Sequence, residues 1–282
     1  MAVSEQAPAQ AQPTKKRLTR RQRARLIRGI QYAVGVLVVL IFAITADWSA
    51  IRKAFFDVEV AKSMFPEVIT IALKNTIIYT ALGFSFGLLL GLVLALMRLS
   101  SVGLYRWLAR GYIEFFRGLP ALLVLIAVGY GIPLAFPGTI LNRNIAIMVA
   151  LGIVSSAYVG EVIRAGIQAV PRGQVEAARS LGMSPARTMV WIVIPQAFRI
   201  ILPPLTNDLI ALTKDSSLAL FLGSTTDQYE LAQFGRVTLT QARSLTPVLV
   251  AGFCYLLITI PLSILSSRLE RRYGSGAITR GA

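Results

Sequence analysis

The sequence predicts an all-α, polytopic membrane protein with about six transmembrane helices, because it is poor in charge and rich in long apolar runs. Of its 282 residues, 55% are hydrophobic and 15% are charged, whereas about 25% are charged in typical soluble domains. The apolar runs are each near the ~20 residues that cross a ~30 Å hydrocarbon layer. They are expected to be helical because a backbone in lipid must satisfy its own hydrogen bonds.

The expected spans lie at about residues 30–46, 69–97, 114–135, 145–164, 200–222 and 246–267. The first run is longer than the apolar part of a usual secretion signal, so we expect an uncleaved first span. It follows a segment, residues 1–29, that is rich in Ala, Gln and Pro and then strongly basic. We expect this segment to be a disordered tail or to bind anionic membrane lipid.

The basic residues predict the orientation of the spans. Lys and Arg gather before residue 30, within 98–117 and 164–199, and after 267, and fewer lie in the segments between. Because cytoplasmic loops are enriched in Lys and Arg, we expect both termini in the cytoplasm. The net charge of +16 then reflects membrane orientation and not nucleic-acid binding, which would spread basic residues along one face.

The absence of certain residue types from the sequence excludes several kinds of catalytic and metal site. The chain has no histidine and a single cysteine, Cys254, which lies in an apolar run. The common zinc sites and the Ser–His and Cys–His catalytic pairs are therefore excluded. The sequence also lacks a GxxxxGK[ST] phosphate-binding loop, so it does not bind ATP by that route. We expect no cofactor, no metal and no enzymatic activity in this chain.

A glycine ladder marks the second expected span. Gly83, Gly87 and Gly91 recur at every fourth position, which places them on one face of a helix. Small residues at this spacing let another helix approach closely. We expect a packing contact here, either within the subunit or across a dimer.

A charged segment, residues 170–195, interrupts the apolar runs. We expect two short helices joined at Gly182, because glycine is favoured just past a helix end. Ser184 and Pro185 are typical of the N-cap and first residue of the second helix, which Pro195 would bend or stop. The first helix has small residues and a charged edge, so it suits docking into a shallow cleft of another protein. The alternative is an amphipathic helix that lies on the membrane.

The same segment resembles the EAA loop of ABC-importer permeases, which reads Glu-Ala-Ala, three residues, Gly, nine residues, Ile, one residue, Leu, Pro. The matching residues are Glu176, Ala177, Ala178, Gly182, Ile192 and Pro195, with Ile194 where the family usually has leucine. Three further stretches resemble the polar amino-acid branch of that family: YIEFFRGLPALLVL (112–125), SSAYVGEVIRAGIQAVPRGQVEAARSLGMS (155–184) and KDSSLALFLG (214–223). That branch contains permeases for histidine, glutamine, glutamate, arginine and cystine.

This resemblance implies a type I importer permease with a MetI-like fold, in the bacterial cell membrane. Such a subunit forms the pathway for a polar amino acid. An extracytoplasmic binding protein delivers the substrate, two ABC ATPase subunits hydrolyse ATP, and a second permease copy or a related chain completes the pathway. The ATPase-coupling residues would be Glu176, Ala177, Ala178, Arg179, Gly182 and Pro195.

The resemblance also divides the chain. Residues 68–270 would form the permease domain, with the coupling loop at 170–195. Residues 30–67 would be an extra first span with its external loop. The basic tail (1–29) and a C-terminal tail (271–282) would both be cytoplasmic.

Ionisable residues inside spans are costly and are functional candidates by default. An amino acid carries a carboxylate and an ammonium, so its pathway needs polar groups of both charge signs. The candidates are Glu161, Arg164, Asn207, Asp208, Lys214 and Asp215. The alternative is that these groups pair with one another and only fix helix packing.

Two other functional classes remain open. An ion-coupled secondary transporter would carry buried acids at the membrane midplane and an inverted repeat. We see no repeat between the two halves, and most acidic residues lie near span ends. A membrane-embedded enzyme would have to use Asp or Lys chemistry.

Overall fold

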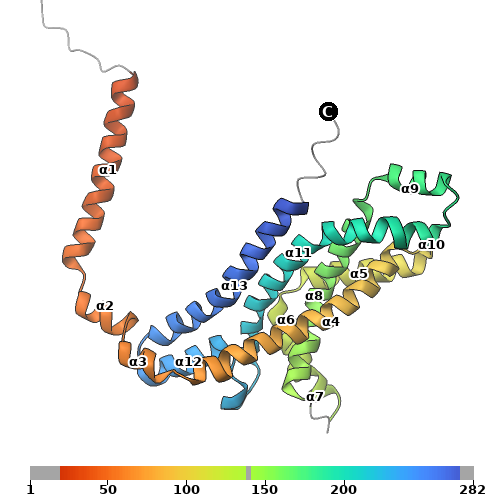
Figure 1. Ribbon diagram of the computed structural model, residues 1–282. Helices are drawn as coiled ribbons and strands as arrows, with labels where there is room; N and C mark the ends of the chain where they lie inside the picture. Colours follow the sequence, from red (N-terminus) through yellow and green to blue (C-terminus); the bar gives the residue numbers. More distant parts are fainter. Residues whose placement is uncertain (1–19, 138–140, 274–282) are drawn as a thin grey trace, which may run out of the picture. The chain divides into compact units, whose positions relative to one another are not determined.

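The computed structural model describes residues 20–137 and 141–273, and this part of the chain contains helices and no strands, as predicted. The chain divides into two units, one ending at Arg52 and one beginning at Lys53. The elements are α1 (Arg20–Thr45), α2 (Trp48–Phe55), α3 (Val58–Ser63), η1 (Val68–Leu73), α4 (Lys74–Leu99), α5 (Gly103–Gly118), α6 (Ala121–Ile126), η2 (Ala127–Gly131), α7 (Ile132–Ala135), α8 (Arg143–Gln168), α9 (Arg172–Ser180), α10 (Pro185–Thr188), η3 (Met189–Val193), α11 (Ile194–Asp215), η4 (Ser216–Phe221), η5 (Thr226–Gln228), α12 (Leu231–Ala242) and α13 (Thr246–Tyr273) (Figure 1).

The N-terminal unit is dominated by α1, which begins at Arg20. Residues 1–19 of the expected tail lie outside the described residues, but the expectation of a disordered segment is wrong for residues 20–29, which are helical. Arg, Gln and Leu are good helix formers and continue directly into the apolar run. After α1 ends, the Trp48 indole donates a hydrogen bond to the Ala43 carbonyl oxygen over 2.8 Å and meets the Phe42 ring edge-on.

In the described residues, five helices are long and apolar enough to span a membrane, or six if one bent pair counts as a single span. The bent pair corrects our expectation of a continuous span at 114–135. It consists of Gly103–Gly118 and Ala121–Ala135, whose axes differ by 105°. Leu119 and Pro120 between them are extended. Proline lacks an N–H and disfavours the helical conformation in the residue before it, which explains the break.

A second correction concerns Pro195, which does not stop the helix. The candidate span runs from Pro185 to Phe221, through α10, η3, α11 and η4. Pro195 stands in the first turn of α11, directly after the π-helical turn η3. The wider turn accommodates a residue without an N–H, and π-bulges of this kind are common at functional sites.

The main unit is built around the contact between α4 and α8, and the glycine ladder lies in this contact. A Cβ added to Gly87 would lie 2.8 Å from the Ser155 Cβ and 3.2 Å from the Gly152 carbonyl oxygen. Gly83 and Gly91 face α8 in the same way, next to Leu151 and Val159. The close approach is therefore within the subunit.

A buried arginine fixes the turn that follows η4. The Arg143 guanidinium, at the start of α8, donates to the carbonyl oxygens of Ala219, Leu222 and Gly223 over 2.9, 2.7 and 2.6 Å. It also donates to the Gln233 side chain of α12 over 3.1 Å. Because these carbonyls end a helical stretch, where the macrodipole favours cations, Arg143 acts as a C-terminal cap supplied by another helix.

We predict that Gly87→Val lowers the thermal stability of the protein in detergent, because the new side chain would collide with backbone and Cβ atoms of α8. Overpacking of this kind costs about 1–3 kcal/mol. Gly252→Val in α13 is the matched control, since a Cβ at Gly252 meets nothing within 4 Å. Equal melting temperatures for the two variants would contradict this role of the ladder.

Candidate functional site

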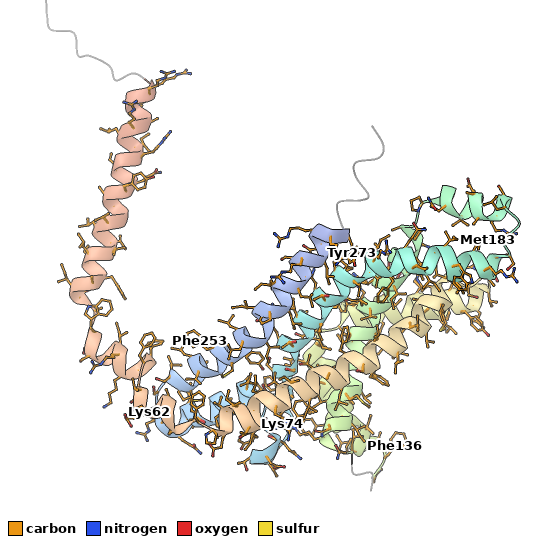
Figure 2. All side chains as sticks on the ribbon, viewed as in Figure 1. Lys62, Lys74, Phe136, Met183, Phe253 and Tyr273 are labelled. Carbon is orange, nitrogen blue, oxygen red and sulfur yellow. The ribbon has the colours of Figure 1, made fainter. Side chains whose placement is uncertain are left out.

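The segment 170–195 folds as two helices joined at Gly182, as predicted. Gly182 has a φ of +82°, a left-handed conformation that glycine adopts without strain. The Gly182 amide donates to the Arg179 carbonyl over 3.0 Å, and the Met183 amide donates to the Ala178 carbonyl over 3.1 Å. This pair of hydrogen bonds is a Schellman motif and ends α9. Figure 2 shows Met183 at the tip of this loop, at one end of the main unit.

The second helix of this segment begins with the expected cap. The Ser184 hydroxyl accepts a hydrogen bond from the Arg187 amide over 3.4 Å, and Pro185 occupies the first turn of α10. A serine cap and a proline in the first turn each favour a helix start. The sharp change of direction between α9 and α10 is therefore encoded by Gly182, Ser184 and Pro185 together.

The two alanines of the EAA sequence face in different directions. Ala178 is buried, whereas Ala177 and Glu176 are exposed on α9. Leu181, just past the end of α9, is 86% exposed. Arg179 is exposed, and its guanidinium donates to the Met183 carbonyl oxygen. Arg179 therefore braces the turn in addition to charging the helix edge.

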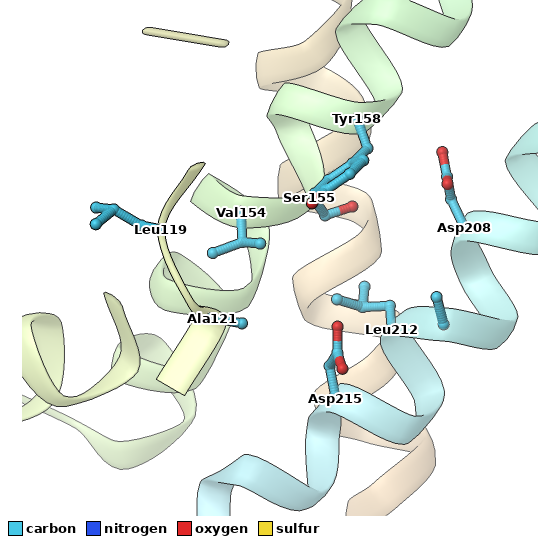
Figure 3. A pocket seen from close by; sticks show the side chains of 9 residues that line it. Leu119, Ala121, Val154, Ser155, Tyr158, Asp208, Leu212 and Asp215 are labelled. Carbon is cyan, nitrogen blue, oxygen red and sulfur yellow. The ribbon is translucent and has the colours of Figure 1, made fainter. Parts of the chain in front are cut away.

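A cavity of about 320 Å³ lies between the start of α6 and the helices α8 and α11 (Figure 3). Two carboxylates from α11 line it, Asp208 and Asp215. They are seven residues apart, which places them on one face of the helix. The Asp208 Oδ2 atom is buried and has no hydrogen-bond partner among the described residues. The other lining residues are Leu119, Ala121, Val154, Ser155, Tyr158, Ala211 and Leu212.

The other candidate pathway residues lie elsewhere. Glu161 and Arg164 form an ion pair with each other on α8, and Arg164 also donates to Gln168, so the packing alternative fits this pair. Lys214 is exposed and does not line the cavity.

Asn207 belongs to a separate contact between α11 and α13. Its side-chain oxygen accepts a hydrogen bond from the Ser266 hydroxyl over 2.8 Å. Its side-chain nitrogen donates to Glu270 over 3.3 Å. Of the candidates, the structure therefore brings only Asp208 and Asp215 together in a cavity.

Sequence reasoning missed Tyr158 and Ser155, which line the cavity but carry no charge and so gave no signal in a search for charged groups. It also gave no signal for the contact that Arg117 makes. The Arg117 guanidinium carbon lies 5.3 Å from the centre of the Tyr158 ring, a cation–π arrangement. That contact depends on how α5 packs near α8, which no local pattern encodes.

Sequence similarity to named transport proteins extends over most of the chain. It is 35% identical over 209 residues to the arginine transport system permease protein ArtQ of Bacillus subtilis, covering 74% of this chain and 92% of that protein. It is 37% identical over 240 residues to the glutamate/aspartate import permease protein GltK of Escherichia coli O157:H7, covering 80% and 97% of the two chains.

Solved transporter structures also match most of the chain. The crystal structure of an amino acid ABC transporter with histidines matches with a TM-score of 0.68 and 37% identity, covering 77% of this chain and 98% of that one. An inward-facing structure of the MetNI methionine ABC transporter matches in fold, with a TM-score of 0.62, 19% identity and coverage of 75% and 98%. The MetI-like fold expected from the EAA loop is therefore confirmed.

Residues 87–275, well over half of the chain, match the family of binding-protein-dependent transport system inner membrane components. This range contains the glycine at position 87, the α9–α10 loop and both cavity carboxylates. The helical spans, the EAA loop and the relatives agree with that match, and the chain belongs to this family.

Proposed function

We propose that this chain is the transmembrane permease subunit of an ABC importer and forms the pathway for a polar amino acid. The observation that carries this is the identity of 35–37%, over most of both chains, to permeases named for amino acids. The cavity at α11 supports it, because two carboxylates in an apolar setting suit a ligand with an ammonium group.

Coupling to ATP hydrolysis is proposed to pass through α9. Its exposed edge, with Glu176, Ala177 and Leu181, would enter a groove on a separate ATPase subunit. Ala178 would fix α9 to the permease from the buried side, and the Gly182 turn would hold the angle between α9 and α10. The residues from Pro185 to Phe221 are helical throughout, so movement of the loop would reach Asp208 and Asp215 along one continuous element.

The complete transporter is proposed to contain two ATPase subunits, a second permease that is a copy or a relative of this chain, and an extracytoplasmic binding protein. ATP would be hydrolysed by the ATPase partners and not by this chain. We expect the α9–α10 loop and both termini on the cytoplasmic side, as the positive-inside rule predicts for six spans. The basic N-terminal residues would then meet anionic lipid at the inner surface.

Reconstitution tests this function against the ion-coupled alternative. The chain, a co-expressed ATPase and a binding protein would be placed in liposomes with labelled L-arginine, L-glutamine, L-glutamate or L-cystine. We expect uptake of one or more of these that requires ATP and the binding protein. Uptake on an ion gradient without ATP would instead support a secondary transporter.

We predict that Gly182→Ala weakens retention of the ATPase subunit in a pull-down and slows ATP-driven uptake. An L residue at a φ of +82° costs roughly 1–2 kcal/mol, which would loosen the end of α9. Gly182→Asn is the matched control, because asparagine tolerates this conformation better. If alanine and asparagine behaved alike, the left-handed turn would not be what positions α9.

We predict that Asp215→Asn lowers the ATP-driven uptake rate by about 10-fold or more, because a hydrogen bond to a charged group contributes about 1.5–3 kcal/mol. Assembly with the ATPase, measured by pull-down, should be unchanged. Asp227→Asn is the control, since Asp227 is an exposed carboxylate in η5 and outside the cavity. Normal uptake by the Asp215 variant would remove this carboxylate from the pathway.

A further inference from the structure

The proposed pathway leaves one charge of its substrate unmatched. The cavity is lined by two carboxylates, Asp208 and Asp215, and by no Lys or Arg. An amino acid brings an α-carboxylate as well as an ammonium, and a carboxylate beside two like charges would be repelled. A cation near the rim of the cavity would match the α-carboxylate of a complete amino acid.

Arg117 stands at this rim. Leu119, two residues later, lines the cavity, and so does Tyr158, on whose ring the Arg117 guanidinium rests at 5.3 Å. Figure 3 shows Tyr158 and Asp208 at the same end of the cavity. Because Arg117 belongs to the last turn of α5, its contact with Tyr158 places that turn beside this end. Three separate elements thus bring a cation, an aromatic ring and a carboxylate together.

The Arg117 guanidinium is available to a ligand. In the described part of the chain it forms no ion pair, whereas the nearby Glu161 is already paired with Arg164. The side chain is exposed, so its N–H donors are not enclosed by the protein. The Tyr158 ring contacts the cation through its face, and the planar donor edge of a guanidinium matches a carboxylate.

We propose that Arg117 is a specificity-determining residue that binds the α-carboxylate of the transported amino acid while Asp208 and Asp215 hold its ammonium. This rests on the proposed function and adds to it how the site distinguishes an amino acid from a simple amine. Tyr158 is a positioning residue in this arrangement, since it fixes the guanidinium at the rim.

Ligand protection of a cavity cysteine tests this directly. The permease–ATPase complex would carry Cys254→Ser and either Ala211→Cys or Ser155→Cys, both at lining positions. Labelling by a maleimide would be measured in nanodiscs without the binding protein, so that its own selectivity does not enter. The probes are L-arginine, L-glutamine, L-glutamate and L-cystine, and then the decarboxylated amine of whichever amino acid protects best.

With Arg117 present, we expect the amino acid to protect at a concentration about 10- to 100-fold lower than its amine, the ratio for one charge-assisted hydrogen-bonding pair. Arg117→Gln should remove most of this preference, and Arg117→Lys should restore part of it. Tyr158→Phe should keep the preference and Tyr158→Leu should reduce it. Arg110→Gln, an exposed arginine two turns earlier on α5, is the matched control and should change nothing.

Several results would overturn the proposal. An unchanged preference in Arg117→Gln, an equal loss for both ligands, or no protection by any of the amino acids would each do so. These are separate from failure of the proposed function, which would appear as the absence of ATP-driven uptake by the unaltered chain. Normal uptake together with a preference that does not depend on Arg117 would remove this residue from substrate recognition and leave the importer intact.

Discussion

The close contact between α4 and α8 is the constraint on which the rest of the main unit depends. Gly83, Gly87 and Gly91 remove the side chains that would separate the two helices, so that atoms of α8 lie where a Cβ would otherwise be. In lipid there is little hydrophobic force between helices, and close van der Waals packing takes its place. Ser155 lies in this contact, and Val154 and Tyr158 are close to it in the sequence, so the same helix that packs on α4 also supplies three cavity residues.

Interruptions in the helices place the functional groups around this rigid pair. The extended residues Leu119 and Pro120 turn the chain by 105°, which brings the end of α5 and the start of α6 to the cavity. The π-helical turn before Pro195 keeps the α9–α10 loop in helical continuity with α11. An uninterrupted helix in place of α5 and α6 would pass the cavity with one face only.

The predictions that succeeded concern neighbours in the sequence. The turn at Gly182 and the Ser184 cap were predictable because each depends on residues within one helical turn. The contact of Arg117 with Tyr158 could not be predicted in this way, and neither could the separation of Asn207 and Lys214 from the cavity. Both depend on contacts between helices that are distant in the chain. Asp208 and Asp215 were found as charges in a span, but nothing local distinguished them from Glu161, which pairs with Arg164.

By itself, the sequence determined the fold class, most of the spans and the loop of two short helices, α9 and α10, with its glycine turn. These features depend on the length of each apolar run and on the local backbone preferences of proline and glycine. It also supplied the family resemblance that the relatives support. Only the tertiary structure decided that the glycine ladder packs within the subunit, that Ala178 faces inward, and which charges share a cavity with Tyr158. The reason is physical: a side chain's direction follows from its own helix, but what it meets there depends on how the helices pack together.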